Sequence, residues 1–200
     1  MPDPNSFFGS QPIFHVDGQE EPTLAAQLSA LVLTETLGEP PRCEATFNNW
    51  VAGALPYPDD RTVGLARPLE IWLGEELLFT GRIVALEGRF PAARHPELRA
   101  VAVGPVRAVD HPATLQLVHG AALRELYVTV ERMTPTRADD PVTARGVAVP
   151  TRGLRVGVRI EVEGVGHHFG GEFRVTETRH LFDHSQGLRT EFVATRATDG

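Results

Sequence analysis

Glycine and proline interrupt this chain so often that only short segments remain between them, and this limits the fold more than any other feature. The chain holds 19 Gly and 16 Pro among its 200 residues. Most segments between them alternate apolar and polar side chains, which is the period of a β-strand and not the 3.6-residue period of a helix. The alternation predicts a mainly β protein built from short antiparallel strands.

The expected strands fall into two groups. The first group covers residues 29–36, 43–50, 69–73, 78–86 and 97–103, and the second covers residues 154–162, 173–182 and 188–195. Gly74 and Glu75 permit a tight hairpin turn within the first group. Between the groups, residues 121–133 combine helical spacing of apolar side chains with the strand-forming run YVTV, and a short helix is the expectation.

Both groups share a loose pattern, in which a strand ends in glycine, a short turn bears phenylalanine and a long strand follows. Two related small antiparallel β-barrels, joined by a short and partly helical bridge, would explain it. The predicted domains are an N-terminal barrel over residues 1–113, a bridge over 114–150 and a C-terminal barrel half over 151–200. Residues 134–141, with two Pro and two Asp, form the expected linker.

Charge and composition exclude several classes of protein. The 19 basic residues are all Arg and stand against 26 acidic ones, without a basic patch, so nucleic acid is not an expected partner. No apolar run approaches the ~20 residues that cross a bilayer, and the first residues lack the pattern of a signal peptide. Cys43 is the sole cysteine and cannot form an intramolecular disulfide.

Catalytic and cofactor motifs are absent from the sequence. It has no nucleophile elbow around serine and no phosphate-binding glycine loop followed by a helix, so we expect no enzyme activity and no cofactor. The densest titratable cluster consists of His167, His168, His180 and His184. A metal site needs three or four converging ligands, and this spacing favours turn and strand-end histidines instead. The alternative is a monomeric β-rich ligand-binding or metal-binding module, or an enzyme, that uses this cluster.

Two stretches carry a family resemblance. Residues 73–83 read LG-x-x-x-LFTG-x-I and include Gly74, Phe79 and Gly81, and residues 153–196 repeat a glycine and aromatic pattern. In that second stretch the marks are Gly164, Gly166, Phe169, Gly171, Val175, His180, Phe182, Gly187 and Thr190. Together with the flanking strands, these stretches resemble the phage late control D proteins, the baseplate hubs of contractile tails and related injection systems. Those proteins are usually longer, so the chain resembles a minimal hub.

The resemblance implies a structural protein and not an enzyme. It implies a homotrimer, whose two barrels per chain give a pseudo-hexameric ring between an inner tube protein and a spike protein, with open β-edges docking against neighbours. It also implies assembly in the cytoplasm, followed by incorporation into a phage-tail-like particle. The expected structural pivots are Phe79, Gly81, Phe169, Gly171 and His180, the glycines because the chain must turn sharply there. None of the residues named above is expected to be catalytic, cofactor-binding or metal-binding. A further alternative is an adaptor or chaperone-like paralogue that caps the tube during assembly.

Overall fold

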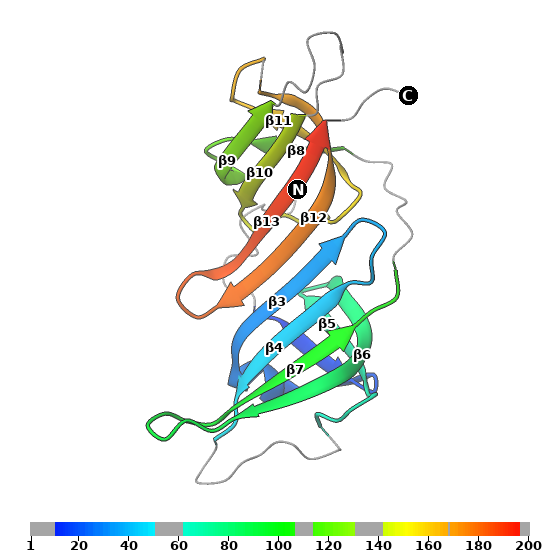
Figure 1. Cartoon of the computed structure of the whole chain (residues 1–200), viewed down its shortest axis with the longest axis vertical. Helices are drawn as coiled ribbons and strands as arrows, with labels where there is room; N and C mark the ends of the chain where they lie inside the picture. Colours follow the sequence, from blue (N-terminus) through cyan, green and yellow to red (C-terminus); the bar gives the residue numbers. More distant parts are fainter. Residues whose placement is uncertain (1–10, 51–61, 107–113, 131–141, 168, 197–200) are drawn as a thin grey trace. The chain divides into compact units, whose positions relative to one another are not determined.

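The computed structural model describes residues 11–50, 62–106, 114–130, 142–167 and 169–196. These residues form 13 strands and one short helix, which confirms the expected mainly β class (Figure 1). The chain divides into two compact units. The first comprises Met1–Thr34, Pro40–Arg107 and Leu181–Leu188, and the second comprises Glu35–Glu39, Ala108–His180 and Arg189–Gly200. No helix of the described residues is long and apolar enough to cross a membrane.

The first unit is an antiparallel sheet. Its elements are β1 (Ile13–Val16), β2 (Gln19–Glu20), α1 (Pro22–Gln27), most of β3 (Leu28–Thr36), β4 (Arg42–Asn48), β5 (Pro68–Leu73), β6 (Glu76–Arg89) and β7 (Glu97–Val103). The strands follow the order β2-β1-β5-β6-β7-β4-β3. The alternation of buried and less buried side chains explains why these segments form strands. In β4, for example, every second side chain is buried, including Cys43, Ala45 and Phe47. Phe14 packs edge-on against Phe47 at 5.5 Å between ring centroids, and both rings belong to the core of this unit.

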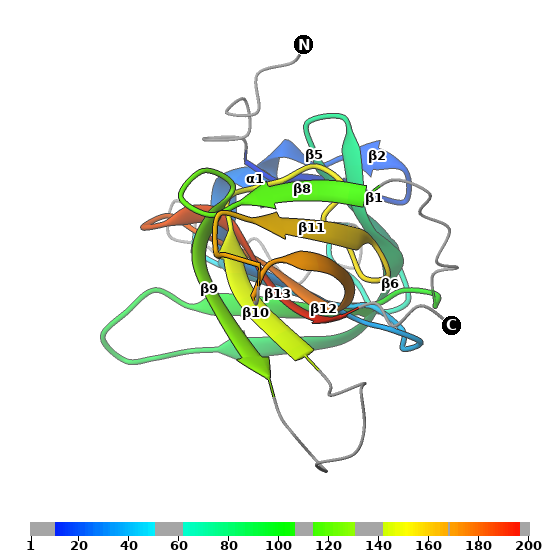
Figure 2. The ribbon, with the colours of Figure 1, turned by 90° about the horizontal axis from the view of Figure 1, so that it is seen from above.

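In the described residues, the second unit holds the last residues of β3 and six further strands, of five to thirteen residues each. These are β8 (Thr114–Val118), β9 (Leu123–Val130), β10 (Val142–Ala148), β11 (Arg159–Glu163), and most of β12 (Gly171–Asp183) and β13 (Gly187–Arg196). These strands follow the order β12-β13-β10-β9, in which β10 pairs antiparallel with both β13 and β9. β11 lies between β12 and β8; it pairs antiparallel with β12 and parallel with β8 (Figure 2). Phe173, Ile160 and Phe192 lie in its core.

Two expectations about the architecture are wrong. Within each unit the described strands follow an open hydrogen-bonded order, so they do not form two closed barrels. The expected helix within residues 121–133 is the strand β9, and there is no helical bridge among the described residues. Leu126 and Val128 of β9 pack against the core while Tyr127 between them is exposed, so strand alternation with β10 satisfies the backbone and overrides the helical spacing.

The expected strand over residues 154–162 begins only at Arg159. Gly157 has a positive φ of 85°, which a strand residue does not adopt, and its N–H donates to the carbonyl of Val175 at 2.7 Å. Residues 154–158 therefore turn, and both Leu154 and Arg155 are buried. The expected linker at 134–141 lies outside the described residues, and the expected domain boundaries stay a prediction.

Candidate interaction surfaces

A row of opposite charges crosses the outward face of the first unit, and we call it the charge ladder: Arg42, Glu44, Arg99 and Glu87. Arg42 Nε donates to Glu44 Oε1 at 2.8 Å, and Arg99 donates both to Glu44 and to Glu87 Oε2, the latter at 2.9 Å. Hydrogen bonds from Arg99 and then Arg42 lower the pKa of Glu44 below its ordinary value. The ladder spans β4, β7 and β6, so it covers the face with paired charges of both signs.

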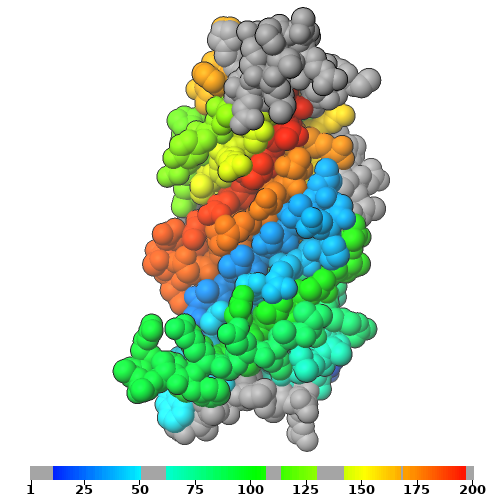
Figure 3. Space-filling model, in the orientation of Figure 1, coloured from blue at the N-terminus to red at the C-terminus, as the bar shows by residue number. Residues whose placement is uncertain are grey.

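The outward face of the second unit carries a shallow groove of about 350 Å³ over β9, β10, β13 and β12. Tyr127 is 67% exposed and lies opposite Arg145 on β10. Arg179 Nη1 donates to Glu191 Oε2 at 3.0 Å on the same face. Side chains of β10 and β13 lie side by side in the space-filling view (Figure 3). An exposed tyrosine bordered by arginines is a composition enriched in protein interfaces.

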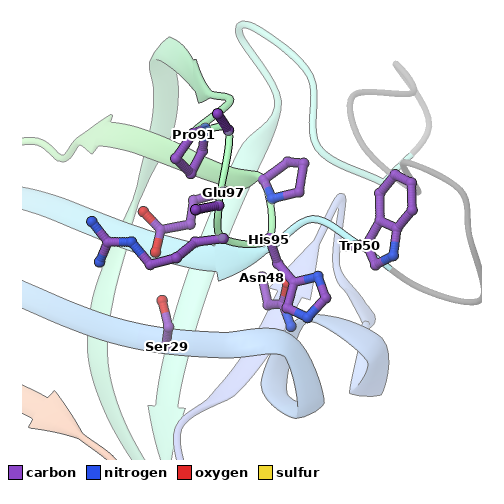
Figure 4. Close-up of a pocket in the computed structure, with 10 residues that line it drawn as sticks. Ser29, Asn48, Trp50, Pro91, His95 and Glu97 are labelled. Carbon is purple, nitrogen blue, oxygen red and sulfur yellow. The ribbon is translucent and has the colours of Figure 1, made fainter.

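A second hollow, open and about 870 Å³ in volume, lies in the first unit where β7 begins (Figure 4). It is lined by Ser29, Asn48, Trp50 and residues 91–97. The Ser29 hydroxyl donates to the carbonyl of Thr46 at 3.0 Å, so a backbone acceptor engages it. Trp50 is 40% exposed at its margin. The hollow therefore offers an open contact surface.

The core of the second unit contains a buried polar cluster, of which sequence reasoning singled out His180 and Thr190 but not Glu35, Arg155 or Thr178. Arg155 Nε donates to Glu35 Oε2 at 2.8 Å, and Thr178 Oγ1 donates to the same oxygen at 3.1 Å. His180 Nδ1 lies 3.0 Å from Thr190 Oγ1. Burial, and then the charge of Arg155, lower the pKa of His180 to about 4, against a smaller opposite effect of Glu35. The imidazole is therefore neutral at pH 7.

The histidines do not converge in the described structure. His180 is in the core of the second unit, whereas His184 belongs to the first unit and donates from Nε2 to the carbonyl of Leu28 at 2.6 Å. His167 is exposed in a turn, and His168 lies outside the described residues. Within the described ranges, no three His, Cys, Asp or Glu side chains are grouped as metal ligands.

The expected structural pivots and the other residues of the resemblance lie mostly in turns and cores. Gly74, Gly164, Gly166, Gly171 and Gly187 all have positive φ, Phe79, His180 and Phe182 are buried, and Phe169 is 48% exposed. Gly81 lies within strand β6 and not in the sharp turn expected there, and a Cβ there would lie 2.5 Å from both Phe79 Cζ and the carbonyl oxygen of Val103. These positions shape the two units, and their role as hub pivots stays a prediction.

Comparison with solved structures identifies tail proteins with this fold. The tail protein of Neisseria meningitidis MC58 aligns with a TM-score of 0.63 at 9% identity, over 94% of this chain and 96% of that chain. The 43 kDa tail protein of prophage MuSo2 from Shewanella oneidensis aligns with a TM-score of 0.67 at 7% identity, over 94% and 98%. The E. coli c3393 protein is described as a component of the type VI secretion system, similar in structure to the bacteriophage T4 tail proteins gp27 and gp5. It aligns with a TM-score of 0.62 at 11% identity, over 86% and 74%.

No protein-family model matches the chain. No curated protein sequence matches it either. The identities of 7–11% with the three solved structures establish a shared fold. The likeness extends over nearly the whole chain, and so includes both units.

Proposed function

We propose that this chain is a structural baseplate hub protein of a phage-tail-like contractile particle or injection system. Three copies would form a pseudo-hexameric ring that connects the inner tube to the spike. The observation that carries the proposal is the likeness of fold to tail proteins over 94% of the chain. The residues of the late control D resemblance point to the same role and were identified independently of the fold.

The surfaces agree with an assembly role. Both units present outward faces of strands with paired Arg and Glu side chains, and the groove beside Tyr127 adds an exposed aromatic anchor. Paired charges of both signs favour partner selection and register more than raw affinity. No observation on the described residues favours the alternative ligand-binding or enzymatic module, because the histidines are dispersed.

The proposal is tested by light scattering and negative-stain imaging of the purified full chain over a range of concentrations. We expect a mass of three chains and ring-shaped particles, because two units per chain would allow a three-fold assembly to match a six-fold tube. A chain that stays monomeric at every concentration, and also in the presence of its tube and spike proteins, contradicts the proposal.

A further inference from the structure

We infer that copies of this chain join head to tail by pairing two free strand edges, β9 of one copy and residues 84–89 of β6 of the next. The inference rests on the proposed ring and names the surfaces that close it. Each edge belongs to a different unit of the chain, so the contact joins unlike surfaces. Contacts of this kind form rings when the rotation closes.

The second half of β6 has an unpaired edge in the described structure. β5 pairs with β6 only from Glu76 to Arg82, and the backbone of Ile83 bonds to residues 66 and 67. From Val84 onward, β7 is the one described strand that pairs with β6. Val84 is 54% exposed. This leaves six consecutive residues with one edge available for another strand.

β9 also has a free edge. It pairs with β10 from Leu123 to Val130, and on its opposite side the described residues show only an isolated bridge between Leu123 and His119, so no described strand pairs there from Glu125 to Val130. The sequence LRELYVTV contains no proline and no glycine. Natural proteins usually blunt or cover a strand edge of this length, because it recruits another strand. An uncovered edge rich in β-branched and aromatic residues therefore indicates a strand partner.

One antiparallel register matches the outward side chains of the two edges. It places Glu125 opposite Arg89 and Tyr127 opposite Glu87. Arg89 already lies 3.9 Å from Glu97 of β7, and Tyr127 lies opposite Arg145 of β10. Glu125 would extend the first of these rows, and Glu87 would extend the second, two strands away from Arg145 with Tyr127 between them. Opposite charges directly across a sheet stabilise it, by about 0.2–1 kcal/mol for each pair.

The same register also matches the inward side chains. It places Val128 opposite Leu86 and Leu126 opposite Gly88. Leu86 is partly buried against the core of the first unit, and Leu126 and Val128 against that of the second. A slip of one residue would turn Glu125 and Tyr127 toward the face on which Leu86 lies, because strand side chains alternate. Both faces therefore select one register.

Pairing of β9 with a second β9 is less well matched. Centred on Tyr127, it would place Glu125 opposite Thr129 and would bring no opposite charges together on this face. The complementary charges lie on β6, so the observations favour a head-to-tail contact over a two-fold contact of β9. A two-fold contact between two β6 edges is the remaining alternative, and cross-linking of the chain with Arg89→Cys alone distinguishes it.

The register is tested by disulfide cross-linking in the full chain that carries both Glu125→Cys and Arg89→Cys. Directly opposed residues lie within the Cα separation that a disulfide requires. We expect oxidation to give covalent dimers and trimers within the assembled ring. The native Cys43 does not interfere, because complete burial raises the pKa of its thiol far above the ordinary value. The matched control carries Thr129→Cys with Arg89→Cys, about 13 Å out of register.

Charge exchange provides a second readout. Glu125→Arg should weaken the assembly constant by about two- to fivefold, and adding Arg89→Glu should restore it, because the pair is inverted and not removed. A ring that forms and cross-links at 125 and 89, but not in the control, supports the inference. A ring without that cross-link, or a chain with Arg89→Cys alone that links to itself, overturns the edge pairing and leaves the proposed ring standing. Absence of any ring overturns the proposed function as well.

Discussion

The two units of this chain use opposite charges in different surroundings. In the first unit Arg99 and Glu44 lie on the outward face, with side chains 40% and 27% exposed, over a core made of apolar residues. In the second unit Glu35 and Arg155 lie inside, with side chains only 2% and 7% exposed, beside Thr178 and His180. An Arg–Glu pair is therefore part of the surface of the first unit, whereas in the second unit such a pair determines the stability of the core.

The two pairs should differ in their effect on stability because they differ in their exposure to water. Exposed pairs gain little, because water screens them and ordering the side chains costs entropy. A buried pair has lost its hydration, so removing one partner leaves an uncompensated charge in the core. Substitutions that look alike in sequence should therefore have unequal effects in the two units, and the following predictions test this contrast.

Arg155→Met should have the largest effect. It leaves the Glu35 carboxylate buried without the two hydrogen bonds that Arg155 donates, and should cost about 3–5 kcal/mol of unfolding free energy. Urea unfolding measures this cost. The double variant with Glu35→Leu should recover most of the loss, because both charges are then gone. A single variant that costs under about 1 kcal/mol would contradict the contrast between the units.

Acid should destabilise the second unit through His180. The pKa of His180 is about 4 in the folded chain, with an ordinary value of 6.5 in the unfolded chain, so the unfolded chain binds more protons between these values. The contribution of His180 to the unfolding free energy is complete above pH 6.5. It is lost as pH falls toward 4, and the loss totals about 3 kcal/mol. Glu35, Arg155 and Thr190 are the groups that face the ring or lie near it.

The pH effect is measured as unfolding free energy at pH 7 and pH 4 in the native chain and in His180→Gln. The variant should show a smaller loss between the two pH values, because glutamine does not titrate. Equal losses in both proteins would show that His180 is not the group responsible.

Gly81→Ala should destabilise the first unit by about 1–3 kcal/mol, since the new methyl group meets the Val103 carbonyl, which is backbone and cannot move aside. Gly88→Ala on the same strand is the matched control. The three atoms nearest to a Cβ there would all belong to the Phe90 ring, a side chain that is 64% exposed and can rotate away. Thermal unfolding of both variants checks the difference, and equal effects would refute the account of Gly81.

Glu44→Gln should have the smallest effect, under about 1 kcal/mol, because the ladder is partly exposed to water. Because hydrogen bonds from Arg99 and Arg42 lower the pKa of Glu44, its small contribution is present above its ordinary pKa and fades as pH falls below that. Raising the salt concentration should reduce the difference from the native chain. An effect as large as that of Arg155→Met would remove the distinction between the units.

Local alternation made much of the fold predictable. The strand over residues 97–103 was predicted with the bounds that β7 has, and the hairpin at Gly74 lies where its turn chemistry placed it. β9 was expected as a helix, because Leu123, Leu126 and Val130 fit helical spacing, and only pairing with β10 decides for a strand. The local pattern could not predict that the strands pair in an open order and not in closed barrels, because this depends on which strands, distant in sequence, pair with one another.

The candidate surfaces were less predictable than the strands. The groove at Tyr127 depends on strands that are distant in sequence, and the Glu35–Arg155 pair joins residues 120 positions apart. Arg155 alternates with Leu154 and Val156 as an exposed strand residue would, so no local signal reveals its burial. The expectation that open β-edges serve assembly stays a prediction, now attached to β9 and β6.

The number and position of copies in purified particles test the central claim most directly. The chain would carry an affinity tag at its C-terminus, and electron microscopy with gold labelling would locate it in particles whose composition is quantified by mass spectrometry. The account predicts three copies for each particle, all at the junction between tube and spike. Copies distributed along the tube, or a chain absent from finished particles, would contradict the proposed hub.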